Sequence, residues 1–160
     1  MRRSQQILAL AGLALAVWAM AYGFYYAVWI EHQTLDHIGG SLAEAFQHAA
    51  LRETTASHAS LADYARAKYV YTREVDAHSH WIGLAMVLMV LAALWNRLSF
   101  GERTRSLLTG ALIAGAYGFP LGVLLQNHVG SGIGQGIAVA ASAVLILAFA
   151  TVAFGFVRRT

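Results

Sequence analysis

Four long apolar runs dominate the hydrophobic pattern of the chain: residues 7–30, 77–95, 106–126 and 133–157. A helix that crosses a bilayer needs about 20 predominantly apolar residues, and each run meets or nearly meets that length. The first run follows Arg2 and Arg3, as a secretory signal would. It is longer than a signal core of about 7–15 residues, and it is rich in aromatic side chains. We therefore expect a retained anchor and four transmembrane helices.

One long polar segment, residues 31–76, separates the first two runs. Ser41-Leu42-Ala43-Glu44 has the form of a capping box and predicts a helix from Leu42 to Arg52. Ser60 predicts the start of a second helix. No Gly or Pro lies between Leu61 and Trp81, so this helix can continue into the second span. The pattern predicts a helical hairpin that covers the outer end of the bundle.

The composition agrees with a membrane protein: 58% of the residues are hydrophobic and 12% are charged, against about 25% charged in a soluble domain. Cysteine is absent, which excludes disulfides and thiolate metal sites. The sequence has no basic patch interleaved with aromatic residues, so we do not expect it to bind nucleic acid. We predict one all-α membrane domain over residues 1–160, an integral membrane four-helix bundle with an extracytoplasmic hairpin between spans 1 and 2.

The distribution of basic residues predicts the orientation. One set of loops holds Arg2, Arg3, Arg97, Arg103, Arg105, Arg158 and Arg159, with Glu102 as its only acid. The other set holds four basic residues against seven acids. The first set is therefore predicted to be cytoplasmic. The protein is then an integral protein of a bacterial inner (plasma) membrane, with both termini on the cytoplasmic side. All seven histidines then fall at or beyond the outer face.

Small residues in the third run predict close helix packing. Gly118 and Gly122 form a G-x-x-x-G pair, which lets helix backbones approach. Pro120 predicts a kink that could open space for a ligand, although plain packing is the simpler interpretation. The glycine-rich stretch 130–136 superficially resembles a phosphate loop. It lacks a preceding strand, and we interpret it as a flexible turn into the fourth span.

Three histidines are predicted to meet at one membrane depth: His78 and His80 begin the second span, and His128 ends the third. Ionisable groups at this depth often mark function. His78 and His80 point roughly 200° apart on a helix, so they cannot bind one ion from a regular helix. His78 shares an apolar face with Ile82, Ala85, Met89 and Ala92. An imidazole above such a face suits haem iron, with His80, His128 and Met89 as further cofactor-binding candidates.

Other interpretations of the histidines stay open. The cluster of His78, His80 and His128 also fits copper or zinc, with His78 and His128 as the metal ligands. Glu74 and Asp76 could supply a carboxylate. For His32, His37, His48 and His58 an amphipathic anchoring role is the simpler interpretation, because imidazoles are common at membrane interfaces.

Two segments at a fixed distance resemble the styrene oxide isomerase family. Ala77-His78-Ser79 opens the second span, as Ala-His-Ser does in that family. Leu98-Ser99-Phe100-Gly101-Glu102-Arg103-Thr104-Arg105-Ser106-Leu107-Leu108 follows at the distance at which the family has a similar loop. The resemblance runs without gaps over residues 77–127. It implies a membrane homotrimer that binds haem b through His78. Ferric haem then acts as a Lewis acid that opens an epoxide of a hydrophobic substrate, and a hydride shift gives an aldehyde.

The chain departs from this family at positions that handle the epoxide. Leu84 and Phe119 stand where the family has asparagines, and Val123 stands where it has a tyrosine. Tyr117 occupies the position of another family aromatic and is the second catalytic candidate beside His78. Three hypotheses result: a haem-dependent isomerase, a non-enzymatic haem b protein for electron transfer or sensing, and a copper- or zinc-binding protein. A hydrophobic small molecule, membrane lipid and further copies of the chain are the expected partners.

Overall fold

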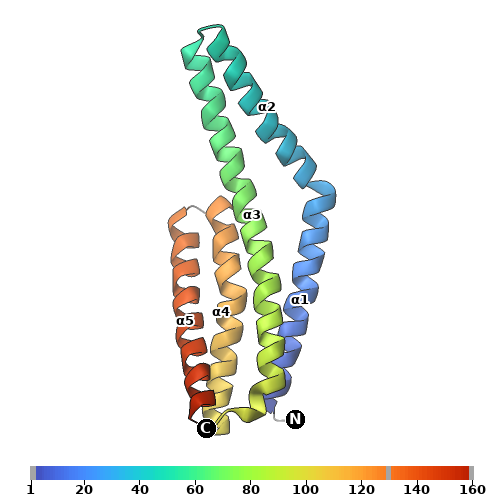
Figure 1. Ribbon diagram of the computed structural model, residues 1–160, viewed down its shortest axis with the longest axis vertical. Helices are drawn as coiled ribbons and strands as arrows, with labels where there is room; N and C mark the ends of the chain where they lie inside the picture. Colours follow the sequence, from blue (N-terminus) through green and yellow to red (C-terminus); the bar gives the residue numbers. More distant parts are fainter. Residues whose placement is uncertain (1–2, 129–130, 159–160) are drawn as a thin grey trace. The chain divides into compact units, whose positions relative to one another are not determined.

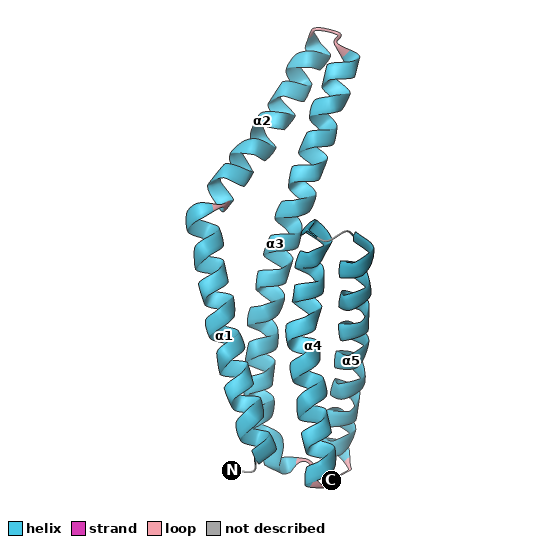
Figure 2. Cartoon of the chain, turned by 180° about the vertical axis from the view of Figure 1, so that it is seen from behind, coloured by secondary structure: helices cyan, strands magenta, loops and turns pink. Residues whose placement is uncertain are grey.

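The computed structural model describes residues 3–128 and 131–158, and every regular element in them is helical (Figures 1 and 2). The elements are α1 (Arg3–Trp29), α2 (Glu31–Ala50), α3 (Thr54–Leu94), the short 3-10 helix η1 (Trp95–Arg97), α4 (Glu102–His128) and α5 (Ser131–Val157). Helices α1, α3, α4 and α5 are long and apolar enough to cross a membrane. The predicted all-α class and its four apolar helices are therefore confirmed.

The chain forms two compact units. The first contains residues 1–20 and 76–160, and the second contains residues 21–75. The sequence had indicated a single domain. Each unit is described by itself below.

In the first unit, α1 and α3 pack along a continuous seam. On α3 the buried seam residues recur at spacings of three and four, a pattern typical of helices that pack at a small crossing angle. They are Trp81, Ala85, Leu88 and Ala92, followed by Trp95 in η1. On α1, Gly12 permits the close approach. A Cβ atom there would lie 3.0 Å from Met89 Cγ and 3.2 Å from the Ala85 carbonyl oxygen.

Helices α4 and α5 lie side by side in the first unit (Figure 1). A Cβ atom at Gly122 would lie 2.5 Å from the backbone nitrogen of Ala138, so the two backbones touch there. The packing role predicted for the G-x-x-x-G pair is confirmed at Gly122. Helix α4 continues through the buried Pro120, and the predicted kink stays a prediction.

A buried polar network closes the end of the first unit at which α1 begins. Trp95 Nε1 donates a hydrogen bond to Ser4 Oγ at 3.3 Å. Arg105 is 3% exposed, and its guanidinium donates to the carbonyl oxygen of Leu98. A buried guanidinium must be hydrogen-bonded to be tolerated. The segment 98–108, which carries part of the resemblance and includes the first turns of α4, is thus held together by the side chain of Arg105.

Several predicted helix boundaries are wrong. Helix α2 begins at Glu31, well before Leu42, and Ser41 lies inside it, where its hydroxyl donates to the His37 carbonyl oxygen at 2.7 Å. A serine that bonds to the carbonyl four residues earlier is accommodated in a helix interior. Helix α3 begins at Thr54 and not after Ser60, and it continues through Leu94 as expected.

Helix α5 begins at Ser131. The described part of the glycine-rich stretch is therefore helical, and the predicted flexible turn is wrong from that residue onward. The reason is close packing: a Cβ atom at Gly134 would lie 2.5 Å from the backbone nitrogen of Gln126. Gly130 lies outside the described residues.

The turn between α2 and α3 offers a stability test, because Arg52 has a positive φ of 62°. A non-glycine residue in the left-handed region costs about 1–2 kcal/mol. Arg52→Gly should therefore stabilise the hairpin by about 1 kcal/mol and slow amide hydrogen exchange near the turn. Arg66→Gly, inside α3, is the matched control and should destabilise by about 1 kcal/mol. Faster exchange in Arg52→Gly would contradict the strain argument.

Candidate functional site: an apolar groove with a histidine

An apolar groove runs along α3, α4 and α5 in the first unit. Its volume is about 490 Å³, within the range of about 300–1,000 Å³ that small-molecule sites occupy. The lining residues are Ser79, His80, Gly83, Leu84, Val87, Phe119, Ser142, Leu145, Ile146 and Phe149. His80 is the only ionisable side chain in this lining. The groove can therefore hold a hydrophobic molecule and offer it a single imidazole.

His80 is exposed and faces the groove from α3. Its ring centroid lies 4.8 Å from that of Phe119 on α4, with an angle of 31° between the planes. A contact of this kind restricts rotation of the imidazole. Gly83 and Leu84, three and four residues later, continue the same helix face. The absence of a side chain at Gly83 leaves open space beside the histidine, because a Cβ atom there would meet nothing within 4 Å.

The polar lining residues gather at one end of the groove. Ala77 on α3 and Ala138 on α5 belong to one buried cluster, and both helices continue from it in the same direction (Figure 1). Ser142 is consequently near the level of His80, whereas Phe149 lies about 10 Å farther along α5. A ligand would meet hydrogen-bonding groups at the His80 end and only apolar side chains at the other.

His78, the predicted haem ligand, occupies a different face of α3. It precedes Trp81 by three residues and so belongs to the series that packs toward α1. Its side chain is half-buried and takes part in an interaction within the chain. The apolar face that was expected to hold a flat ligand is covered at Ala85 and Met89, where α1 approaches at Gly12. His78 and His80 were predicted to point in different directions, and their surroundings differ accordingly. His78 belongs to the α3 face that packs toward α1, whereas His80 lines the groove.

The remaining predicted residues are spread over the first unit. Met89 is half-buried against Gly12. Tyr117 donates its hydroxyl proton to the Ala11 carbonyl oxygen at 3.0 Å. It also lines a cavity of about 190 Å³ with Trp18, Trp81 and Leu121. His128 is the last residue of α4, and its side chain lies outside the described part.

Two of the three residues that depart from the resemblance lie in the groove: Leu84 and Phe119 both line it. Val123 is buried in the cluster of Ala77 and Ala138. The groove therefore has an apolar wall at Leu84 and Phe119, with the imidazole of His80 at one end.

Two histidines of the second unit have local partners. His37 Nε2 lies 3.3 Å from Asp63 Oδ2, and His48 Nδ1 lies 2.6 Å from Glu53 Oε2. Within residues 3–128 and 131–158, no three His, Asp or Glu side chains form a group that could hold a metal ion. The expected copper or zinc site includes His128, whose side chain lies outside the described part, so this site stays a prediction.

Sequence reasoning missed the groove because it followed the helix face of His78. The signal for the other face was present: His80, Gly83, Leu84 and Val87 share the spacing of a helix side. Phe119 and Ser142 had no local signal, since they come from other helices. Comparison of the chain with protein-family models, curated proteins and solved structures found no match.

Proposed function

We propose that this chain is an integral membrane protein that binds haem b and isomerises a hydrophobic, epoxide-like substrate taken from the bilayer. The single observation that carries the proposal is the groove of about 490 Å³ whose only ionisable lining residue is His80. The proposed orientation has both termini in the cytoplasm, because the arginine-rich loops lie at the end of the spans where the chain begins.

The residues of the groove fit the chemistry of haem b. An imidazole is the commonest protein ligand of haem iron, and an apolar wall excludes water from the porphyrin. His80 would hold the iron, with its ring steadied by Phe119. Leu84, Val87 and Phe149 would form the apolar surroundings. Ferric haem supplies a Lewis acid, which stabilises negative charge on an oxygen as an epoxide opens.

The resemblance implies His78 as the iron ligand, whereas the groove favours His80. Matched variants separate these assignments. The purified wild-type protein, expressed with ample haem, should show a Soret band. His80→Ala should lose it, and His78→Ala should retain it. If only His78→Ala loses the Soret band, His78 is the iron ligand, as the resemblance implies. A colourless wild-type protein would reject haem binding altogether.

Isomerase activity needs its own assay. Haem-loaded protein should convert an aryl epoxide to the aldehyde without consuming a reductant or oxidant. Full haem loading without turnover would reject the isomerase while leaving haem binding intact.

A second candidate function is a non-enzymatic haem b protein for electron transfer or sensing. It is favoured by the apolar residues Leu84 and Phe119 in the groove, because few polar groups remain to position an epoxide. For this second function we expect the haem absorption spectrum to be six-coordinate and low-spin, and to change when the second histidine ligand is replaced. A five-coordinate spectrum would favour the isomerase.

A further inference from the structure

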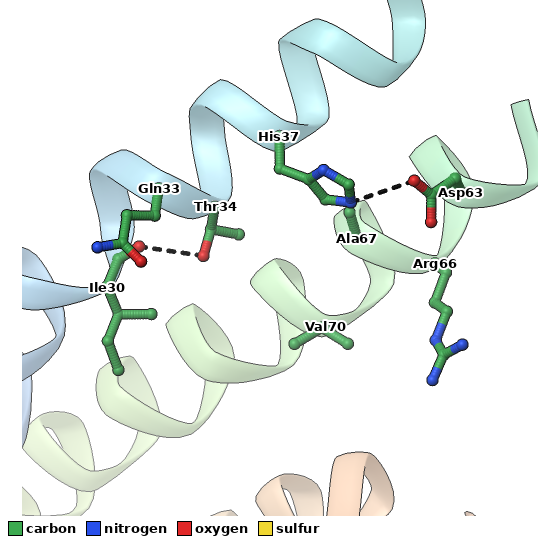
Figure 3. Close-up of a pocket in the computed structure, with 8 residues that line it drawn as sticks. All are labelled: Ile30, Gln33, Thr34, His37, Asp63, Arg66, Ala67 and Val70. Carbon is green, nitrogen blue, oxygen red and sulfur yellow. Dashed lines mark hydrogen bonds and ion pairs between the residues drawn. The ribbon is translucent and has the colours of Figure 1, made fainter. Parts of the chain in front are cut away.

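A cavity of about 360 Å³ lies between α2 and α3 in the second unit (Figure 3). This volume is within the range of about 300–1,000 Å³ that small-molecule sites occupy. Each helix contributes side chains at spacings of three and four, so each presents one face to the cavity. The lining residues are Ile30, Gln33, Thr34, His37, Asp63, Arg66, Ala67 and Val70. None of them belongs to residues 77–127, over which the family resemblance runs.

The cavity is apolar at one end and charged at the other. His37 Nε2 lies 3.3 Å from Asp63 Oδ2, and this contact aligns the two antiparallel helices. In that alignment Ile30 is level with Val70, about 10 Å along the helices from the His37–Asp63 pair. Ile30, Ala67 and Val70 are half-buried and form an apolar floor. Ile30 directly follows α1, which is apolar enough to cross a membrane, so the apolar end lies where α2 joins α1.

Arg66 is the charged lining residue that remains available to a ligand. Asp63 is already engaged by His37. Arg66 forms no ion pair within residues 3–128 and 131–158, and Figure 3 shows its side chain extending away from the His37–Asp63 contact. Glu44 lies outside this lining, in a neighbouring hollow that Asp63 and Arg66 also border. A guanidinium presents its donors in a fixed fork that matches a carboxylate or a phosphate. The cavity therefore offers an anion-binding group beside an apolar floor.

We propose that this cavity binds a single-chain amphiphile with an anionic head group, such as a fatty carboxylate. The head group accepts hydrogen bonds from the Arg66 guanidinium, and the amide of Gln33 on the other helix donates a further one. The chain lies over Ala67 toward Ile30 and Val70, where burial of its methylene groups contributes hydrophobic stabilisation. The apolar part of the ligand then points toward the end of α2 that joins α1. This inference uses only the second unit and does not depend on haem binding or on activity.

Equilibrium dialysis tests the site with the full-length protein in phosphatidylcholine nanodiscs. Radiolabelled decanoate should bind to these nanodiscs beyond the amount that empty nanodiscs take up. Arg66→Gln should weaken this binding about tenfold, because a charge-assisted hydrogen bond is lost. Lys68→Gln is the matched control: it removes the same charge from α3 outside the lining and should bind decanoate as the wild-type protein does. Equal losses in the two variants, or no binding above that of empty nanodiscs, would overturn the proposal.

Two further probes test the charge and the kind of the head group. Decylamine has the same chain with a cationic head group and should show no protein-dependent binding. Equal binding of decylamine and decanoate would overturn the proposal, because the apolar floor would then account for it without Arg66. Decyl phosphate separates the two anionic head groups that a guanidinium can bind. Tighter binding than that of decanoate identifies a phosphate head group, weaker binding identifies a carboxylate, and both results support an anionic ligand.

Asp63→Asn tests the sign of the site independently of Arg66. Asp63 carries the only carboxylate of the lining, so its removal should strengthen decanoate binding several-fold by relieving repulsion of the anionic head group. Asparagine keeps a hydrogen-bond acceptor for His37, so the alignment of α2 and α3 is retained. Glu53→Gln, which removes the carboxylate of the other histidine contact outside this cavity, is the matched control and should leave the affinity unchanged. An unchanged or weaker affinity in Asp63→Asn would overturn the proposal.

Discussion

Replacing Gly122 by alanine should lower the free energy of unfolding by about 2 kcal/mol, the scale of overpacking in a close-packed interior. The added methyl group would lie 2.5 Å from the Ala138 nitrogen and 2.8 Å from its Cα. Both atoms are backbone, so no side-chain rotation relieves the overlap and α4 must separate from α5. The expected fall in melting temperature in detergent or nanodiscs is roughly 4–8 °C.

Gly110→Ala is the matched control, because a Cβ atom at Gly110 meets nothing within 4 Å. This substitution should leave the melting temperature unchanged or raise it slightly, since alanine favours helix by about 1 kcal/mol over glycine. Equal effects at Gly110 and Gly122 would show that helix propensity, and not backbone contact between α4 and α5, decides the outcome.

Replacing Gly83 by leucine should abolish ligand binding in the groove while the protein still folds. The position borders His80, and a Cβ atom there meets nothing within 4 Å. The leucine side chain would therefore extend into the space available to a ligand without disturbing the core. We expect the Kd for haem to rise at least about tenfold, which corresponds to about 1.4 kcal/mol of binding free energy, and the haem content of the purified protein to fall.

Gly110→Leu is the control for this experiment. It makes the same chemical change at another exposed, uncrowded position of the first unit, on α4 and outside the groove lining. Haem content and melting temperature should match the wild-type protein. Unchanged haem content in Gly83→Leu would place the ligand elsewhere, and the His78 face of α3 would become the next site to examine.

Local sequence patterns were informative about element type and less so about boundaries. Runs of apolar residues predicted all four long apolar helices. The start of α2 was missed because Ser41 has the sequence of a cap. In the structure its hydroxyl bonds to His37, a local alternative that the sequence permits equally well. The glycine-rich stretch lacks a preceding strand and was predicted to be a flexible turn. In α5 its Gly134 instead permits contact with α4.

At the candidate site, too, some properties of single residues could be predicted from the sequence and others could not. That His78 and His80 point in different directions followed from helix geometry alone. Which of them adjoins open space did not follow, because the answer depends on what each helix face meets. Helix α1 covers the face at Ala85 and Met89, whereas Phe119 and Ser142 approach the face of His80 without filling it.

By itself, the sequence determined that this chain is helical, that four of its helices suit a bilayer, and that its two neighbouring histidines cannot serve one ion from a regular helix. These properties follow from composition and from the fixed rotation of 100° per residue in a helix. Only the tertiary structure decided that the groove adjoins His80. This depends on contacts between residues far apart in the sequence, and no local pattern encodes which helix faces meet.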